Sequence, residues 1–302
     1  MLRFFLVFGV LIVLFGCSSS LILSSDSPSL KTDGYLGGNV ICDPKTGIYW
    51  WIFSDKIDNT VKLAKTVDLI HWEVEYHIDD ADSACLRKFG SAWYIFYGSE
   101  SNIWMIKSQT INKDYSFPFL VLNSDIGKWD SIVFGPDIVW NDGLYYLFYT
   151  GQSDSICKIG YAISHSASGP FIKYQNNPVL QGQTALDYWN SGKEKASYPC
   201  VEKIGDWFVI QHTASSINER DSIGWAITKN FLNFYCWESS IFDGKNSDWS
   251  SEGVSRGGLF KIGEQWYLSY SGKSNQDKYG KSGMSKMDLD VILKPILLRG
   301  NK

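Results

Sequence analysis

One short aromatic pattern of hydrophobic and polar positions occurs five times along this chain. Aromatic and β-branched side chains pack well on half-buried pleated faces, so each occurrence predicts a β-strand. The five occurrences are GIYWWIFSD (47–55), SAWYIFYGS (91–99), LYYLFYTGQ (144–152), DWFVIQHTA (206–214) and QWYLSYSGK (265–273). No long stretch follows the helical period, so the pattern favours an all-β chain.

Each aromatic strand has a predicted strand on either side. The preceding strands end in turns: ICDPKTG, CLRKFG, IVWNDG, CVEKIG and LFKIG. The following strands are VKLAKT (61–66), IWMIKS (103–108), IGYAIS (159–164), IGWAIT (223–228) and SGMSK (282–286). Units of three strands that recur every 45 to 60 residues, roughly, have the spacing of propeller blades. The sequence therefore predicts an all-β fold, a five-bladed β-propeller.

The amino terminus predicts export and a lipid anchor. Residues 1–16 carry one basic residue and an apolar run of signal-peptide length, which is short for a membrane span. The phrase LFGC that ends at Cys17 resembles a bacterial lipoprotein box, which implies lipidation of Cys17. An ordinary signal peptide or an uncleaved anchor are the alternatives. We expect a lipoprotein signal peptide (1–16), a serine-rich tether (17–30), a propeller domain (31–302), and an exported bacterial lipoprotein attached to a membrane.

Charge and cysteine usage narrow the ligand classes. The formal charge is −4 and no basic stripe is present, so a nucleic-acid partner is not expected. The cysteines lack C-x-x-C spacing, so no zinc site is predicted, and Cys42, Cys85 and Cys200 are expected to be small buried residues. No metal site and no organic cofactor is expected; a structural cation in the channel has no support in the sequence.

Candidate site residues cluster where the first strand of each blade begins. In a propeller these strands line the central channel, so polar residues at their entrances converge although they are distant in sequence. The five entrances are LGGNVIC (36–42), DDADSAC (79–85), VFGPDIV (133–139), KASYPCV (195–201) and GVSRGGL (253–259). They supply Asn39, Asp82, Asp137, Ser197, Tyr198 and Arg256.

Three phrases resemble a known superfamily. WDSIVFGPDIVWNDGLYYLFYTG (129–151), IGYAISHSASGPFIKYQNNPVL (159–180) and DLIHWE (68–73) are similar to segments of glycoside hydrolase families 43 and 32. These families contain arabinanases, β-xylosidases, levansucrases and invertases. The resemblance extends over residues 35–295, approximately. It implies a five-bladed propeller, a carbohydrate substrate and cleavage of glycosidic bonds by two carboxyl groups.

The resemblance also implies roles for carboxylates. Ala81-Asp82-Ser83-Ala84 is the nearest match to the A-D-P-S segment that holds the family's general base, so Asp82 is expected to be base or nucleophile. Asp137 matches the aspartate of W-A-P-D, which lies at the floor of the sugar site and is expected to bind and orient the sugar.

The general acid of the family lies in an E-G-P context that this chain lacks. The corresponding position is Ser197 in the fourth blade or Ser255 in the fifth, and a glutamate precedes each of them by three residues. Glu252 is therefore the expected acid, with Glu194 in reserve. Either glutamate is placed to face Asp82 across the channel.

Aromatic and basic residues complete the expected site. Trp129, Trp189 and Trp249 recur in the phrases WDS, WNS and WSS, where they either stack on sugar rings or pack between blades. His212 is placed close to the channel. Arg256 is expected to pair with Asp137 or Glu252, or to hold the ligand.

Two rival functions remain open from the sequence. A non-catalytic glycan-binding propeller is favoured by Asn39, Ser197 and Ser255, which stand where carboxylates are expected. A propeller phosphorylase would need a cluster of basic residues for phosphate, of which Arg256 and His212 supply only two.

Overall fold

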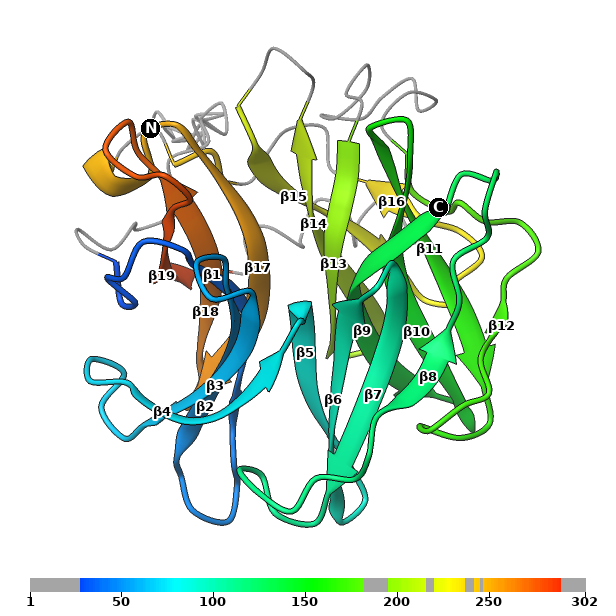
Figure 1. Ribbon diagram of the computed structural model, residues 1–302, viewed down its shortest axis with the longest axis horizontal. Helices are drawn as coiled ribbons and strands as arrows, with labels where there is room; N and C mark the ends of the chain where they lie inside the picture. Colours follow the sequence, from blue (N-terminus) through cyan, green and yellow to red (C-terminus); the bar gives the residue numbers. More distant parts are fainter. Residues whose placement is uncertain (1–27, 182–194, 216–219, 237–241, 245–246, 289–302) are drawn as a thin grey trace, which may run out of the picture.

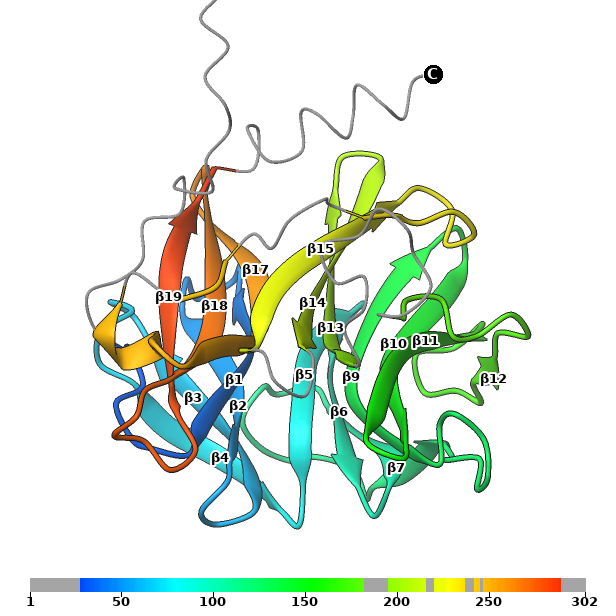
Figure 2. The ribbon, with the colours of Figure 1, turned by 90° about the horizontal axis from the view of Figure 1, so that it is seen from above.

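The structure is a computed structural model that describes residues 28–181, 195–215, 220–236, 242–244 and 247–288. Its sheets stand around a common centre, as Figure 1 shows from one side and Figure 2 after a quarter turn. Five antiparallel blades follow one another along the chain, two of them joined into one sheet by a single parallel pair between β11 and β13, so the predicted five-bladed β-propeller is confirmed. Apart from one 3₁₀ turn, η1 (Asp248–Ser250), the described residues form strands and loops.

The strands follow the repeated pattern of the sequence. Blade I contains β1 (Tyr35–Cys42), β2 (Tyr49–Asp55), β3 (Thr60–Thr66) and β4 (Glu73–Asp79). Blade II contains β5 (Asp82–Phe89), β6 (Ala92–Ser99), β7 (Asn102–Ser108) and β8 (Phe119–Leu122). Blade III contains β9 (Ile132–Asn141), β10 (Leu144–Ser153), β11 (Ile156–Ser164) and β12 (Ile172–Lys173). Blade IV contains β13 (Lys195–Ile204), β14 (Trp207–Ser215), β15 (Ser222–Thr228) and β16 (Tyr235–Cys236). Blade V contains β17 (Gly253–Ile262), β18 (Gln265–Lys273) and β19 (Lys281–Met287).

The sequence pattern predicts three strands per blade, and four of the blades have a fourth. These outer strands are short, two to seven residues, and two of them have only two residues. A two-residue strand leaves no alternation to detect in a sequence. Their position at the rim of each blade does not affect the channel.

The amino-terminal segment closes the ring on blade V. Leu30 pairs with Ser282 of β19, so this segment takes the place of an outer strand. The Asp33 carboxylate accepts three backbone hydrogen bonds, from the amides of residues 278 to 280. The first strand of blade I is therefore held against the last blade before it enters the channel.

Five hydrophobic clusters fill the spaces between adjacent blades. Trp50 and Ile52 of blade I pack with Leu86 and Ile95 of blade II, for example. The remaining clusters join blades II and III, III and IV, IV and V, and V and I. The aromatic second strands therefore make the core, and the first strands are left to line the centre.

Three other expectations concern single features. Cys85 and Cys200 are buried as expected, but Cys42 is exposed, because it ends β1 beside the turn to β2. No helix in the described ranges has the length and apolar character needed to cross a bilayer. The signal peptide, Cys17 and most of the tether lie outside the described residues.

Candidate functional site

A β-bulge marks the entrance of every first strand. The register shifts between Gly37 and Val40 in β1 and at the equivalent point of β5, β9, β13 and β17. Three bulge residues are non-glycine residues with left-handed backbone: Ser83 (φ 45°), Tyr198 (φ 52°) and Arg256 (φ 47°). This conformation costs an L-residue about 1–2 kcal/mol. Strain repeated at one level of the channel is typical of side chains that are aimed for function.

Hydroxyl groups on the second strands hold these bulges in place. Each accepts the backbone N–H of the bulge in the next blade, at 2.8–3.0 Å. The acceptors are Ser54, Thr150, Thr213 and Ser271, and the donors are Ser83, Tyr198, Arg256 and Gly37, respectively.

Blade II breaks this pattern. Gly98 stands where the other second strands have a hydroxyl residue, and the Gly135 N–H instead bonds to Ser83 Oγ at 2.9 Å. A Cβ atom at Gly98 would lie 3.0 Å from the Asp82 carbonyl oxygen and 3.4 Å from Phe134 Cβ. The absence of a side chain therefore allows Asp82 and Phe134 to approach Gly98 closely, beside a cavity that Gly98 also lines.

A cavity of about 360 Å³ occupies this space, between blades II and III. Its volume is within the range of small-molecule sites. One wall is aromatic, because the rings of Phe134 and Tyr198 meet edge to face with centroids 5.2 Å apart. The lining residues are Asn59, Asp80, Asp82, Gly98, Ser99, Glu100, Ser101, Ile132, Val133, Phe134, Gln152 and Tyr198.

Asp82 is the charged centre of the cavity. Its Oδ2 lies 2.6 Å from Lys56 Nζ and its Oδ1 lies 3.2 Å from Arg256 Nη1. Burial alone would raise the pKa of Asp82, but Arg256 and Lys56 outweigh burial and hold this pKa well below its usual range. The sequence predicted that Arg256 would pair with Asp137 or Glu252, or hold the ligand. The carboxylate that it pairs with is Asp82 instead, and its contact with a ligand stays a prediction.

Tyr198 and Arg256 support each other beside Asp82. The guanidinium carbon lies 4.0 Å from the Tyr198 ring centroid, and Arg256 Nη2 donates to the phenol oxygen at 2.5 Å. Burial raises the pKa of Tyr198 to about 12, so the phenol keeps its proton at neutral pH. Because the phenol oxygen already accepts from Arg256, its own hydrogen is free to point to a ligand.

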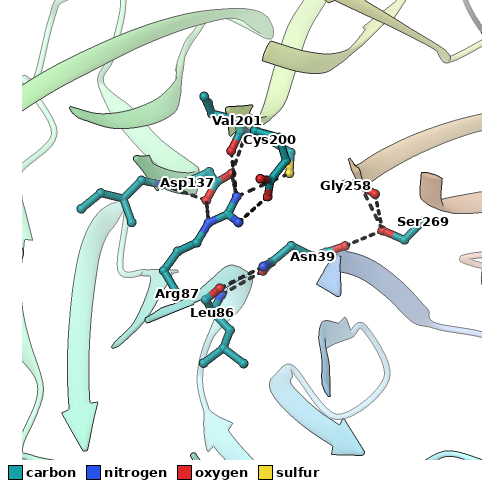
Figure 3. Close-up of polar contacts among 11 residues, drawn as sticks. Asn39, Leu86, Arg87, Asp137, Cys200, Val201, Gly258 and Ser269 are labelled. Atoms are coloured by element: carbon teal, nitrogen blue, oxygen red, sulfur yellow. Dashed lines mark hydrogen bonds and ion pairs between the residues drawn. The ribbon is translucent and has the colours of Figure 1, made fainter. Parts of the chain in front are cut away.

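Below the cavity, Asp137 is bound by the protein itself. Arg87 donates to both its carboxylate oxygens, from Nε at 2.8 Å and from Nη2 at 2.6 Å, as Figure 3 shows. The backbone amides of Ile138 and Val201 also bond to it. Asp137 lines a narrow space of about 30 Å³ in the channel and has 1% of its surface exposed. Its geometry supports a structural role, and its contact with a sugar stays a prediction.

Arg87 was not identified from the sequence. It is largely buried and also pairs with Glu202 at 2.6 Å, so it links the first strands of blades II, III and IV. Burial raises the pKa of Glu202, and Arg87 only partly opposes this. The signal was available, because Arg87 lies within the predicted first strand CLRKFG and an inward-facing charge needs partners.

Asn39 is also engaged within the protein. Its amide donates to the Leu86 carbonyl and accepts from the Leu86 N–H, both at 2.9 Å (Figure 3). This side chain therefore extends the contact between β1 and β5 in the manner of a peptide group. It lines the narrow space in the channel and not the cavity around Asp82.

The other predicted residues lie away from the cavity or outside the described residues. Ser197 and His212 are buried, with 5% and 1% exposed, and do not line it. Burial lowers the pKa of His212 to about 4. Glu252 is exposed just before β17, where its N–H bonds to the Lys273 carbonyl, and it does not line the cavity. Glu194 lies outside the described residues.

The tryptophans of the WDS and WSS phrases pack on the second strands of their own blades and belong to the hydrophobic clusters between blades. Trp129 stacks on Tyr149 with centroids 5.7 Å apart, and Trp249 stacks on Tyr270 at 5.0 Å. Each indole also covers a glycine of the second strand, Gly151 or Gly272, where a Cβ atom would collide with the ring. This repetition supports the packing alternative for both. Trp189 lies outside the described residues.

The described residues contain no group of three or more His, Cys, Asp or Glu side chains placed to hold a metal ion.

No family model matches the chain. Two proteins described as probable arabinan endo-1,5-alpha-L-arabinosidase A, from Aspergillus flavus and Aspergillus oryzae, are each 33% identical to it over 88 residues. The match covers 29% of this chain and 25% of each Aspergillus protein, so it spans about a quarter of these relatives.

Solved structures agree with the fold over most of the chain. A thermostable family-43 glycoside hydrolase has a TM-score of 0.68 at 14% identity, covering 85% of this chain and 90% of its own. The catalytic domain of a Coprinopsis cinerea GH62 alpha-L-arabinofuranosidase has a TM-score of 0.66 at 12% identity, and the match covers 89% of this chain and 97% of that domain. A xylan beta-1,4-xylosidase from Bacillus halodurans has a TM-score of 0.61 at 14% identity, and the match covers 87% of this chain and 54% of the xylosidase chain. At these identities the likeness confirms the expected resemblance at the level of the fold.

Proposed function

We propose that this chain is a glycoside hydrolase whose substrate binds in the cavity around Asp82. The observation that carries the proposal is a carboxylate, Asp82, that is held ionised by Lys56 and Arg256 beside an aromatic wall at the mouth of a propeller channel. A sugar ring presents C–H groups to aromatic faces and hydroxyls to charged groups, so both kinds of wall have a partner in a glycan. The shared fold alone would not carry the function.

In the proposed reaction Asp82 serves as base or nucleophile at the anomeric carbon. Its low pKa keeps it ionised, and each of its oxygens retains a lone pair beyond the one that faces a cation. Tyr198 donates a hydrogen bond to a sugar hydroxyl, and Arg256 fixes both Tyr198 and Asp82. Phe134 forms the apolar surface under the ring.

The second carboxyl group protonates the leaving oxygen. The sequence favours Glu252, with Glu194 in reserve, whereas Asp80 and Glu100 are the further carboxylates that line the cavity. Replacing the true acid slows substrates with poor leaving groups far more than activated aryl glycosides, because only the former need protonation. Comparing the Gln and Asn variants of these four residues on both substrate types therefore identifies the acid.

The names of the matched proteins direct the choice of substrate. Arabinan, arabinofuranosides and β-1,4-xylan are the polymers or glycosides that they are described as cleaving. We propose a pentose-containing plant polysaccharide, or a fragment of one, as the substrate class. Export and anchoring through Cys17 would place the enzyme outside the cytoplasm, where such polymers occur. Labelled palmitate should be incorporated by the wild type and not by Cys17→Ala, which tests the lipid anchor.

The test is turnover on linear 1,5-α-arabinan, xylan, and the 4-nitrophenyl glycosides of α-L-arabinofuranose and β-D-xylose. The wild type should hydrolyse at least one of them, and Asp82→Asn should lose about 10²- to 10⁴-fold in kcat while still binding it. Asp154→Asn, which removes an exposed carboxylate from the β10–β11 hairpin, is the control and should be unchanged. Equal turnover by Asp82→Asn and the wild type would refute the assignment.

A non-catalytic glycan-binding propeller is the second candidate. It is favoured because both oxygens of Asp82 are engaged by cations, and because the equivalent entrance positions of the other blades are Leu36, Phe134, Ser197 and Ser255. Saturable binding of an arabino-oligosaccharide without turnover of any of the four substrates would establish this candidate.

A further inference from the structure

Blade I offers no charged side chain at its own channel entrance, yet it reaches the cavity of blade II through a hairpin. Lys56 lies in the β2–β3 hairpin, and its Nζ is 2.6 Å from Asp82 Oδ2. Nothing in the predicted first strands pointed to it. The contact joins residues that are 26 positions apart and belong to different blades.

The hairpin that carries Lys56 is fixed at several points. The Lys56 N–H donates to the Gly34 carbonyl at 3.0 Å. The buried carboxylate of Asp55 accepts from the Ile57 and Asp58 amides and pairs with Lys62. The backbone on both sides of Lys56 is therefore held, so the direction in which its side chain leaves the hairpin is set by the fold.

The two cations on Asp82 differ in freedom. Arg256 has 8% of its side chain exposed and is further held by Ser54 Oγ and by the Tyr198 ring. Lys56 has 27% of its side chain exposed, and within the described part of the chain its ammonium group forms an ion pair with Asp82. Arg256 is thus a fixed partner of Asp82, whereas Lys56 is a more exposed partner with fewer contacts.

We propose that Lys56 is a positioning residue that orients Asp82 and sets its proton affinity for the proposed glycosidase reaction. The inference rests on the proposed function for its catalytic consequence, and on geometry alone for its effect on Asp82. The groups that face Asp82 are Lys56 from the β2–β3 hairpin, Arg256 from β17 and Tyr198 from β13. Asp80 and Glu100 share the cavity.

Removing the ammonium changes the balance around Asp82. One cation would then face the carboxylate, while burial and the neighbouring carboxylates favour its protonated form. The loss of an opposite charge at this distance raises a carboxyl pKa by about 1–3 units. Asp82 would then take up a proton at a higher pH than in the wild type, and the Oδ2 atom would lose the contact that fixes its direction.

The experiment compares Lys56→Gln, Lys56→Arg and the control Lys45→Gln, which removes an exposed lysine from the β1–β2 turn of the same blade. The Asp82 carboxyl is titrated by ¹³C NMR, which needs no substrate. We expect the Lys56→Gln midpoint to rise by about one unit or more. Lys56→Arg and Lys45→Gln should keep the wild-type midpoint. An unchanged midpoint in Lys56→Gln overturns the proposal.

The second readout is the pH profile of kcat/KM on whichever of the four substrates the wild type hydrolyses. One unit below its new midpoint, Asp82 of Lys56→Gln is ionised in about a tenth of the molecules, so kcat/KM there should fall about tenfold. At alkaline pH only the lost orientation of Asp82 remains, so kcat/KM should lie closer to the wild-type value than at acidic pH, though still below it. A parallel loss at every pH, or none at any pH, contradicts a positioning role. Lack of wild-type turnover refutes the hydrolase instead, and the NMR titration still decides the role of Lys56.

Discussion

Arg87 and Asp137 form a two-pronged ion pair in the channel, with Nε–Oδ1 and Nη2–Oδ2 distances of 2.8 Å and 2.6 Å. The pair joins the first strands of blades II and III across 50 positions of sequence. Asp137, the carboxylate that most resembles a family motif, is thereby engaged within the protein, whereas Asp82 lines the cavity between two cations.

Asp137→Asn should destabilise the fold by about 3–5 kcal/mol, because Arg87 would keep its buried charge with only Glu202 as a partner. Arg87→Met combined with Asp137→Asn should lose less than the sum of the single changes, since the pair acts as a unit. Urea denaturation measures both, with the exposed Lys128→Ala as the control. Full stability in Asp137→Asn together with lost turnover would instead support a direct role of Asp137 at the sugar.

Gly98→Ala should narrow the cavity. The new Cβ would approach the Asp82 carbonyl to 3.0 Å, and Phe134 and Ser83 to 3.4 Å each. An ill-fitting methyl group in a pocket changes affinity by about 10- to 200-fold, so KM should rise within that range. Gly90→Ala is the matched control, because it lies in the β5–β6 turn of the same blade with open space around it. It should cost stability and leave KM unchanged; an unchanged KM in Gly98→Ala would place the substrate elsewhere.

Stability should fall as the pH drops from about 6.5 to 4 because of His212. Burial holds the folded pKa at about 4 against an ordinary value of 6.5, so the unfolded chain binds the proton first. A difference of this size corresponds to about 3 kcal/mol, lost progressively between those two pH values. His212→Gln should flatten this part of the stability profile, and exposed His77→Gln should not. Identical pH dependence in the wild type and His212→Gln would show that the pKa of His212 does not differ between the folded and the unfolded chain.

The fold was predictable because its signal repeats. The aromatic second strands form the core between blades, so burial imposes the same pattern five times. Asp82, Tyr198 and Arg256 were also found, because they stand at bulges in the predicted first strands. The bulge geometry that turns Arg256 toward Asp82 could not be predicted from the sequence pattern.

Residues whose partners lie in another blade were harder to identify from the sequence. Lys56 contacts Asp82 from a hairpin in the neighbouring blade, so the sequence around Lys56 does not predict this contact. Asn39 and Asp137 resembled ligand groups, but the Leu86 backbone and the Arg87 side chain engage them. Such pairings depend on how blades pack side by side, which a pattern within one strand does not specify.

The central claim is that the cavity beside Asp82 is where a glycan binds for cleavage. The most direct measurement is a crystal structure of the Asp82→Asn protein with 1,5-α-L-arabinotriose or, if the wild type cleaves only xylan, xylotriose. The account predicts a sugar ring against Phe134 and Tyr198, with a glycosidic oxygen facing residue 82. A sugar bound on another face, or a cavity left empty at saturating oligosaccharide, would contradict it.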